Sequence, residues 1–222
     1  MENIKKTKKF IFTSPFQKEG QLQTVVYQAD EDGPLQYGET NFPIIPVING
    51  YVKENDEIEV VCIVTKCSPD IPTDAPASEI YPNAKQNYER FKESISELAK
   101  IKKFNYNLNE IEVDYDERVT NHLKIYSELI SNVGDNEKIY ADITFGSKAI
   151  PIVEIMALNY AYKLRKNTHI GAIVYGQYDP VTKKSYIYDV SPLFFMDAIS
   201  NTMAQMKIEN PAEKIKALLE ID

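Results

Sequence analysis

Polar residues gather where one apolar segment of the chain ends, at Asp142, Thr144, Ser147 and Lys148. Gly146 stands among them and can take backbone conformations that other residues avoid. A helix beginning here would direct free backbone N–H groups and the positive end of its dipole toward one spot, with the Lys148 ammonium beside it. This combination predicts a binding site for an anion, most naturally a phosphate group.

The stretch differs from the two best-known phosphate-binding loops. It lacks the spaced glycines of the dinucleotide-binding motif, and no Ser or Thr follows Lys148 as it would in a Walker loop. On spacing alone, a plain strand–turn–helix connection with Ser147 as the helix cap and a solvated lysine is the simpler interpretation. The number of polar side chains at one strand end exceeds what a cap requires, and this favours a ligand site.

A βαβ unit is expected to position these residues. Residues 139–144 and 170–175 are apolar runs typical of buried strands, and a helix with Pro151 in its first turn separates them. A connection of this length joins parallel strands in a right-handed crossover. The polar turn then lies at the carboxyl end of the first strand.

Similar patterns predict the other elements. Apolar runs and amphipathic spacing indicate strands at 8–13, 24–28, 59–65, 105–113 and 186–190, and helices at 83–103 and 116–133. Pro43 and Pro46 interrupt the apolar residues 42–52, so a helix there is expected to begin no earlier than Pro46. The proline-rich residues 68–82 predict a long loop that is functional or disordered.

This order of elements predicts an α/β fold. We expect a Rossmann-like open, mostly parallel sheet with helices on both faces, a terminal β-hairpin turning at 180–184, and C-terminal helices. Residues 1–190 would form this domain. Residues 191–222 would form a helical segment that serves dimerisation or links the domain to an effector module.

The composition limits the function classes. A formal net charge of −8 over 222 residues argues against binding of duplex DNA or RNA. No segment approaches the roughly 20 apolar residues of a membrane span, and the basic start leads into a strand rather than a signal-peptide core. Cys62 and Cys67 make neither a disulfide framework nor a zinc site. We therefore expect a cytoplasmic protein with no membrane partner, no metal and no cofactor.

Four stretches resemble the CARF (CRISPR-associated Rossmann fold) domains. They are TSPF at 13–16, EVVCIVT at 59–65, DITFGSKAIP at 142–151 and AIVYGQYD at 172–179. The DITFGSK turn resembles the branch of this family with an Asp-Ile-Thr-x-Gly-x-[RK] turn. The resemblance implies a homodimer that binds cyclic oligoadenylate across its two-fold interface.

The resemblance also implies which residues contact the ligand: Thr13, Ser14, Phe16, Thr144, Phe145, Gly146, Ser147 and Lys148. Adenine bases need stacking partners, for which Tyr175 and Tyr178 are further candidates beside the two phenylalanines. An even-numbered adenosine ring can share the two-fold symmetry of a dimer, so each subunit would bind half of it.

Three functions are open at this point. The first is a sensor of cyclic oligoadenylate, cyclic tetra-adenylate foremost, in type III CRISPR defence. The second is a metal-independent ring nuclease in which a ribose 2′-OH attacks the adjacent phosphate, with Lys148 and Ser14 as the catalytic candidates. The third is a nucleotide-binding α/β enzyme of another class. We expect His122 and His169 to be structural, because neither is placed at the polar turn.

Overall fold

The computed structural model describes residues 6–18, 20–29, 33–67 and 76–219. Most of the predicted loop at 68–82 thus lies outside the described residues. By internal contacts the chain divides into two units, Met1–Asp189 and Val190–Asp222.

The first unit contains an eight-stranded sheet in the order β3-β2-β8-β7-β6-β1-β4-β5. The strands are β1 Thr7–Thr13, β2 Val25–Gln28, β3 Glu39–Thr40, β4 Glu57–Lys66, β5 Asn105–Asp114, β6 Glu137–Asp142, β7 His169–Asp179 and β8 Lys184–Asp189. The five consecutive strands β7, β6, β1, β4 and β5 are mutually parallel. β8 returns antiparallel to β7 as the predicted hairpin. β2 pairs in parallel with β8, and β3 pairs with β2 at the edge of the sheet. The predicted α/β fold is confirmed.

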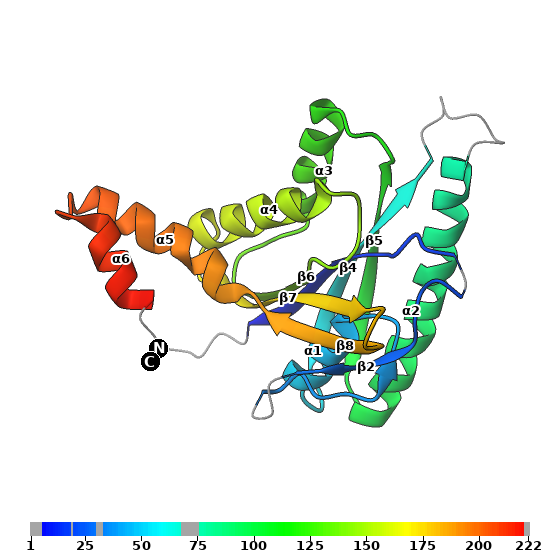
Figure 1. Ribbon diagram of the computed structural model, residues 1–222. Helices are drawn as coiled ribbons and strands as arrows, with labels where there is room; N and C mark the ends of the chain where they lie inside the picture. The colour runs from blue at the N-terminus through cyan, green and yellow to red at the C-terminus, as the bar shows by residue number, and fades with distance from the viewer. Residues whose placement is uncertain (1–5, 19, 30–32, 68–75, 220–222) are drawn as a thin grey trace. The chain divides into compact units, whose positions relative to one another are not determined.

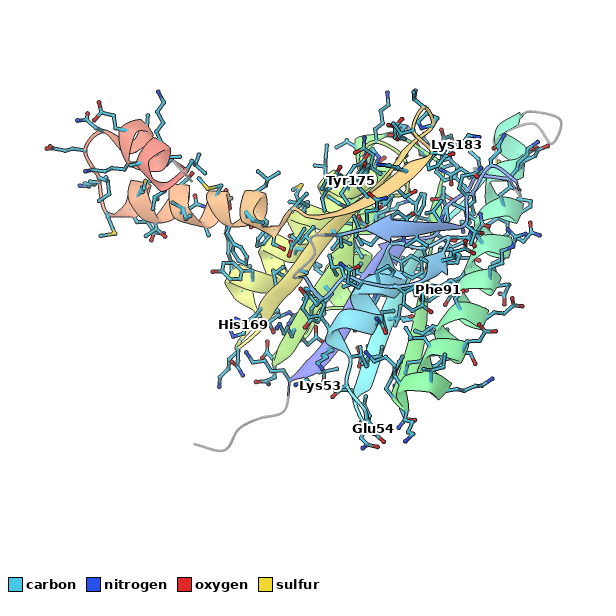
Figure 2. All side chains as sticks on the ribbon, turned by 60° about the horizontal axis from the view of Figure 1, so that its bottom comes forward. Lys53, Glu54, Phe91, His169, Tyr175 and Lys183 are labelled. Atoms are coloured by element: carbon cyan, nitrogen blue, oxygen red, sulfur yellow. The ribbon has the colours of Figure 1, made fainter. Side chains whose placement is uncertain are left out.

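Helices cover both faces of this sheet (Figure 1). They are α1 Ile44–Tyr51, the short 3-10 helix η1 Pro76–Glu79, α2 Ile80–Lys102, α3 Val119–Ser131 and α4 Ile150–Leu164. The aromatic ring of Phe91, on the sheet side of α2, contacts Phe12 of β1 with 4.4 Å between ring centroids (Figure 2). Apolar residues of β1, β4, α1 and α2 therefore make one continuous core cluster.

Two helices begin earlier than the proline pattern predicts. α1 starts at Ile44, so the expectation of a start at Pro46 or later is wrong. Pro46 and Pro82 each occupy the third position of their helix, in α1 and α2. An N–H group in a first helical turn has no partner within the helix, so its absence costs nothing there.

The second unit consists of α5 Ser191–Gln205 and α6 Pro211–Leu219. Pro211 is the first residue of α6, a position where its missing N–H costs nothing. α6 buries none of its residues. None of the helices among the described residues has the length and apolar character needed to cross a membrane.

Candidate functional site

The chain changes direction across the sheet at β1. β4 and β5 follow on one side of β1, whereas β6 and β7 lie on its other side. Ligands of open α/β sheets bind outside the carboxyl ends of the strands at such a switch point. The two segments that meet there are residues 14–17 after β1 and residues 143–149 after β6.

A buried carboxylate supports the turn after β6. The Asp142 side chain accepts hydrogen bonds from the backbone N–H of Thr144 at 3.0 Å and from the Thr144 hydroxyl. The same hydroxyl accepts the Gly176 N–H of β7 at 2.7 Å. Burial raises the pKa of Asp142 to about 6, although hydrogen bonds from Thr144 and from the backbone of Ile44 oppose the shift. Asp142 and Thr144 thus fix the turn from inside.

The turn itself needs a glycine and is longer than predicted. Gly146 has φ +113°, and a Cβ there would lie 3.0 Å from the Ile150 side chain. α4 has Ala149 as its N-cap and no side-chain cap, so the predicted cap by the Ser147 hydroxyl is wrong. Ser147 lies two residues before the cap, where its backbone carbonyl accepts the Ile150 N–H at 3.0 Å. Lys148 is exposed, and no ion pair involves it within the described ranges.

The predicted contact residues after β1 face the protein interior. Thr13 is buried, and its hydroxyl donates to Glu154 of α4 at 2.9 Å. Ser14 is fully buried, and its hydroxyl donates to the Ala84 carbonyl of α2 at 2.7 Å. The Phe16 ring packs edge-on against Tyr115. In this conformation the hydroxyls hold β1 to α4 and α2.

Glu154 is a second buried carboxyl group near the turn. The residue is 1% exposed, and its Oε2 atom has no hydrogen-bond partner among the described residues. Burial raises the pKa of Glu154 well above its usual range, and the nearby Asp142 carboxylate adds to this. Burial thus disfavours the charged form of Glu154 beside the switch point.

A cavity of about 170 Å³ opens over the carboxyl ends of β6 and β7. Its lining comes from the segment after β1, from β2, from the turn after β6 and from β7: Gln17, Gln21, Leu22, Gln23, Val25, Tyr27, Thr144, Phe145, Gly176 and Tyr178. We call this the switch-point pocket. Three of the predicted contact residues line it, namely Thr144, Phe145 and Tyr178.

Other predicted residues lie around the pocket rather than in it. Gly146, Ser147 and Lys148 continue the turn that starts at Thr144. Tyr175 is exposed beside its cross-strand partner Tyr188. Alternation along β7 puts Tyr175 on the sheet face opposite to Val174, which belongs to the core cluster with α1 and α2. Tyr175 and Tyr178 therefore do not form one wall.

The largest contribution to the pocket comes from residues 17–25, none of which was among the predicted contact residues. Its signal is the glutamine-rich stretch QKEGQLQ directly after the first strand end. Three amide side chains follow one another there at Gln17, Gln21 and Gln23. Their approach to Tyr178 depends on the pairing of β2 with β8, which no local pattern predicts.

The site offers no metal-binding cluster within the residues that are described, where His, Cys, Asp and Glu nowhere form a group of three or more. His122 lies 3.5 Å from a Glu117 carboxylate oxygen. Figure 2 shows His169 at the opposite end of the sheet from Tyr175. Polar, aromatic and backbone groups are therefore what this site presents to a ligand.

No protein-family model matches the chain. The chain is similar to CRISPR-associated protein MJ1674 of Methanocaldococcus jannaschii, with 27% identity over 110 residues. The matched stretch covers 49% of this chain and 17% of the relative. The chain is thus distantly similar to part of a much longer CRISPR-associated protein.

Proposed function

We propose that this chain acts in CRISPR antiviral defence as a sensor that binds cyclic oligoadenylate, with cyclic tetra-adenylate as the expected ligand. The observation that carries the proposal is the switch-point pocket, where amide and aromatic side chains meet the turn that bears Lys148. Bases need stacking surfaces and hydrogen-bonding edges, and phosphates need donors. The similarity to a CRISPR-associated protein supports the biological setting.

The size of the pocket favours a ligand shared between two chains. Its volume of about 170 Å³ lies below the roughly 300–1,000 Å³ typical of pockets that enclose a whole small ligand. A cyclic tetranucleotide is larger still. Two chains related by a two-fold axis would each take half of a two-fold symmetric ring. We therefore propose a homodimer with the ring at its axis.

Exposed apolar side chains beside the turn support this dimer. Ile152 and Met156 lie on successive turns of α4 and are both exposed. Tyr175 and Tyr188 are exposed as a cross-strand pair on β7 and β8. Light scattering at micromolar concentration is expected to give twice the 25.4 kDa chain mass. A species of the chain mass alone would contradict the dimer.

Sensing is favoured over cleavage of the ring. The Ser14 hydroxyl, one of the two catalytic candidates, is fully buried and donates to the Ala84 carbonyl. Cleavage would then depend on Lys148 and on in-line placement of the ribose 2′-OH, which binding does not require. Any cleavage should be slow and independent of magnesium. The effector activity that the sensor controls would reside in an associated or fused module.

One experiment tests the proposal. Purified protein in excess is incubated in EDTA with labelled cyclic tetra-adenylate, and bound and cleaved ring are measured over an hour. Linear tetra-adenylate, with the same bases and no ring, is the control ligand. We expect retention of intact cyclic tetra-adenylate. Complete conversion within minutes would identify a ring nuclease, and failure to retain the ring would refute the proposed function.

A further inference from the structure

One amide oxygen in the switch-point pocket has no partner. The Oε1 atom of Gln17 is buried and makes no hydrogen bond to any residue that the structure describes, although Gln17 lines the cavity. A buried amide oxygen without a partner costs about 1–3 kcal/mol, so a ligand that satisfies it is favoured. We propose that Gln17 is the residue that selects adenine in the bound ring. This inference rests on the proposed function.

The backbone around Gln17 is held firmly. Asn87 of α2 is 2% exposed, and its amide nitrogen donates to the carbonyl oxygens of Pro15 at 2.8 Å and Gln17 at 3.0 Å. The Ser14 hydroxyl adds a bond to the same helix. Gln17 therefore projects from a segment fixed on α2, as a selective contact requires.

The remaining glutamines of the segment have other roles. The Gln23 amide nitrogen donates to the Gly20 carbonyl at 3.2 Å, which stabilises the loop itself. The Asn41 amide nitrogen donates to the Thr24 hydroxyl at 2.9 Å, which stabilises the C-terminal end of the loop. Gln21 is exposed. Among the three glutamines that line the pocket, Gln17, Gln21 and Gln23, only Gln17 has a buried oxygen without a partner in the described residues.

Aromatic rings complete a site suited to one base. Tyr27, Phe145 and Tyr178 line the same cavity. Stacking of a base on an aromatic ring is sequence-tolerant, because every base has a flat π-face. The rings can therefore supply affinity, but they do not distinguish adenine from other purines. Selection has to come from a polar group at the edge of the base.

A glutamine amide matches the edge of adenine. Its oxygen accepts the exocyclic N6 amine while its NH₂ group donates to N7. Hypoxanthine has an oxygen in place of that amine, so the same edge presents two acceptors. In either orientation, an amide can pair with only one of them. Gln17 should therefore favour adenine by about 10- to 100-fold.

The test compares two synthetic rings, cyclic tetra-adenylate and its counterpart with inosine at all four positions. Wild-type protein is expected to bind the adenosine ring at least about 10-fold more tightly. In Gln17→Leu this preference should disappear, through weaker binding of the adenosine ring. Gln28→Leu is the matched control, since Gln28 is an exposed glutamine of β2 outside the pocket.

The outcomes separate this inference from the proposed function. Wild-type protein that does not retain the adenosine ring overturns both. Wild-type protein that binds the ring, with an unchanged base preference in Gln17→Leu, overturns the role of Gln17 alone. Thermal unfolding of each variant checks the fold. If Gln17→Leu does not fold, Gln17→Met replaces it, because the methionine side chain has a similar length, no NH₂ donor and only a weakly accepting sulfur; a retained preference there is equally decisive.

Discussion

Buried charged side chains have different partners at the two ends of the parallel strands. At the amino end, Lys9 of β1 is buried and lies 2.7 Å from Glu137 and 3.1 Å from Glu59. Its ammonium also donates to the Asn132 carbonyl at the end of α3. Three acceptors thus meet the three donors of the lysine, and a cation stands where the helix dipole favours one.

At the carboxyl end, buried carboxyl groups have no such cation. Asp142 is held by hydrogen bonds alone, and Glu154 accepts a hydrogen bond from the Thr13 hydroxyl. Nearby, the exposed Lys148 has no ion pair and the Gln17 amide oxygen has no hydrogen-bond partner among the described residues. The amino end is therefore arranged for stability, whereas the carboxyl end keeps polar groups available for a ligand. This difference can be tested residue by residue.

The largest effect is expected at the amino end. Lys9→Met removes the cation and leaves the Glu137 carboxylate buried without its partner, which should cost about 3–5 kcal/mol of unfolding free energy. Denaturant unfolding measures this loss. Lys103→Ala is the control, because Lys103 and Glu54 form an exposed pair for which a loss below about 1 kcal/mol is expected. Equal losses in the two variants would contradict the comparison.

The next effect depends on pH and concerns Asp142. Its pKa is about 6 in the folded protein and 3.8 without the fold. Between these values only the folded state holds the proton, so the contribution of Asp142 to the stability of the wild-type protein falls as pH rises from 4 to 6. At 1.36 kcal/mol per pKa unit, the loss is about 3 kcal/mol.

Asp142→Asn removes this titration, so its stability relative to wild type should rise by about 3 kcal/mol between pH 4 and pH 7. Chemical unfolding at several pH values gives the difference. Asp179→Asn is the control: hydrogen bonds from Thr182 and Val181 lower the pKa of this exposed group. Its pKa is shifted away from the range between pH 4 and pH 7, so a flat difference is expected there. A flat profile for Asp142→Asn as well would mean that burial does not raise its pKa.

The strands were predictable because buried strands are local runs of apolar residues in the sequence. Residues 60–64 form an unbroken apolar run, and all are buried in β4. The start of α4 was not predictable in this way. Serine is a more common N-cap residue than alanine, but the turn around Gly146 makes Ala149 the N-cap. Likewise, the position of Gln17 in the pocket depends on Asn87, which is 70 residues away in sequence and donates a hydrogen bond to the Gln17 carbonyl. Such contacts arise from tertiary packing, which single-sequence patterns do not record.

At the carboxyl end, Lys148→Ala should weaken binding of cyclic tetra-adenylate by about 1.5–3 kcal/mol, the range for a hydrogen bond to a charged group. Stability should not change, because the side chain is exposed. Calorimetric titration measures the affinity. Lys53→Ala is the control, since Figure 2 shows Lys53 at the opposite end of the sheet from Tyr175. Unchanged affinity in Lys148→Ala would place the ring elsewhere.

The smallest effect is expected at Ser14, and it decides between sensing and cleavage. Ser14→Ala removes the hydroxyl that donates to the Ala84 carbonyl and should cost about 1 kcal/mol of stability, the usual net value of a neutral hydrogen bond. Ser131→Ala is the control, because the exposed Ser131 hydroxyl makes the same kind of bond to a helix carbonyl and should contribute less.

Residual cleavage of the ring should be the same in wild type and Ser14→Ala, because a hydroxyl that donates into the protein interior is not available to a phosphate. Cleavage lost in Ser14→Ala with affinity retained would show that Ser14 leaves Ala84 when the ring binds. The segment after β1 would then rearrange on binding, and the carboxyl end of the sheet would be a catalytic site.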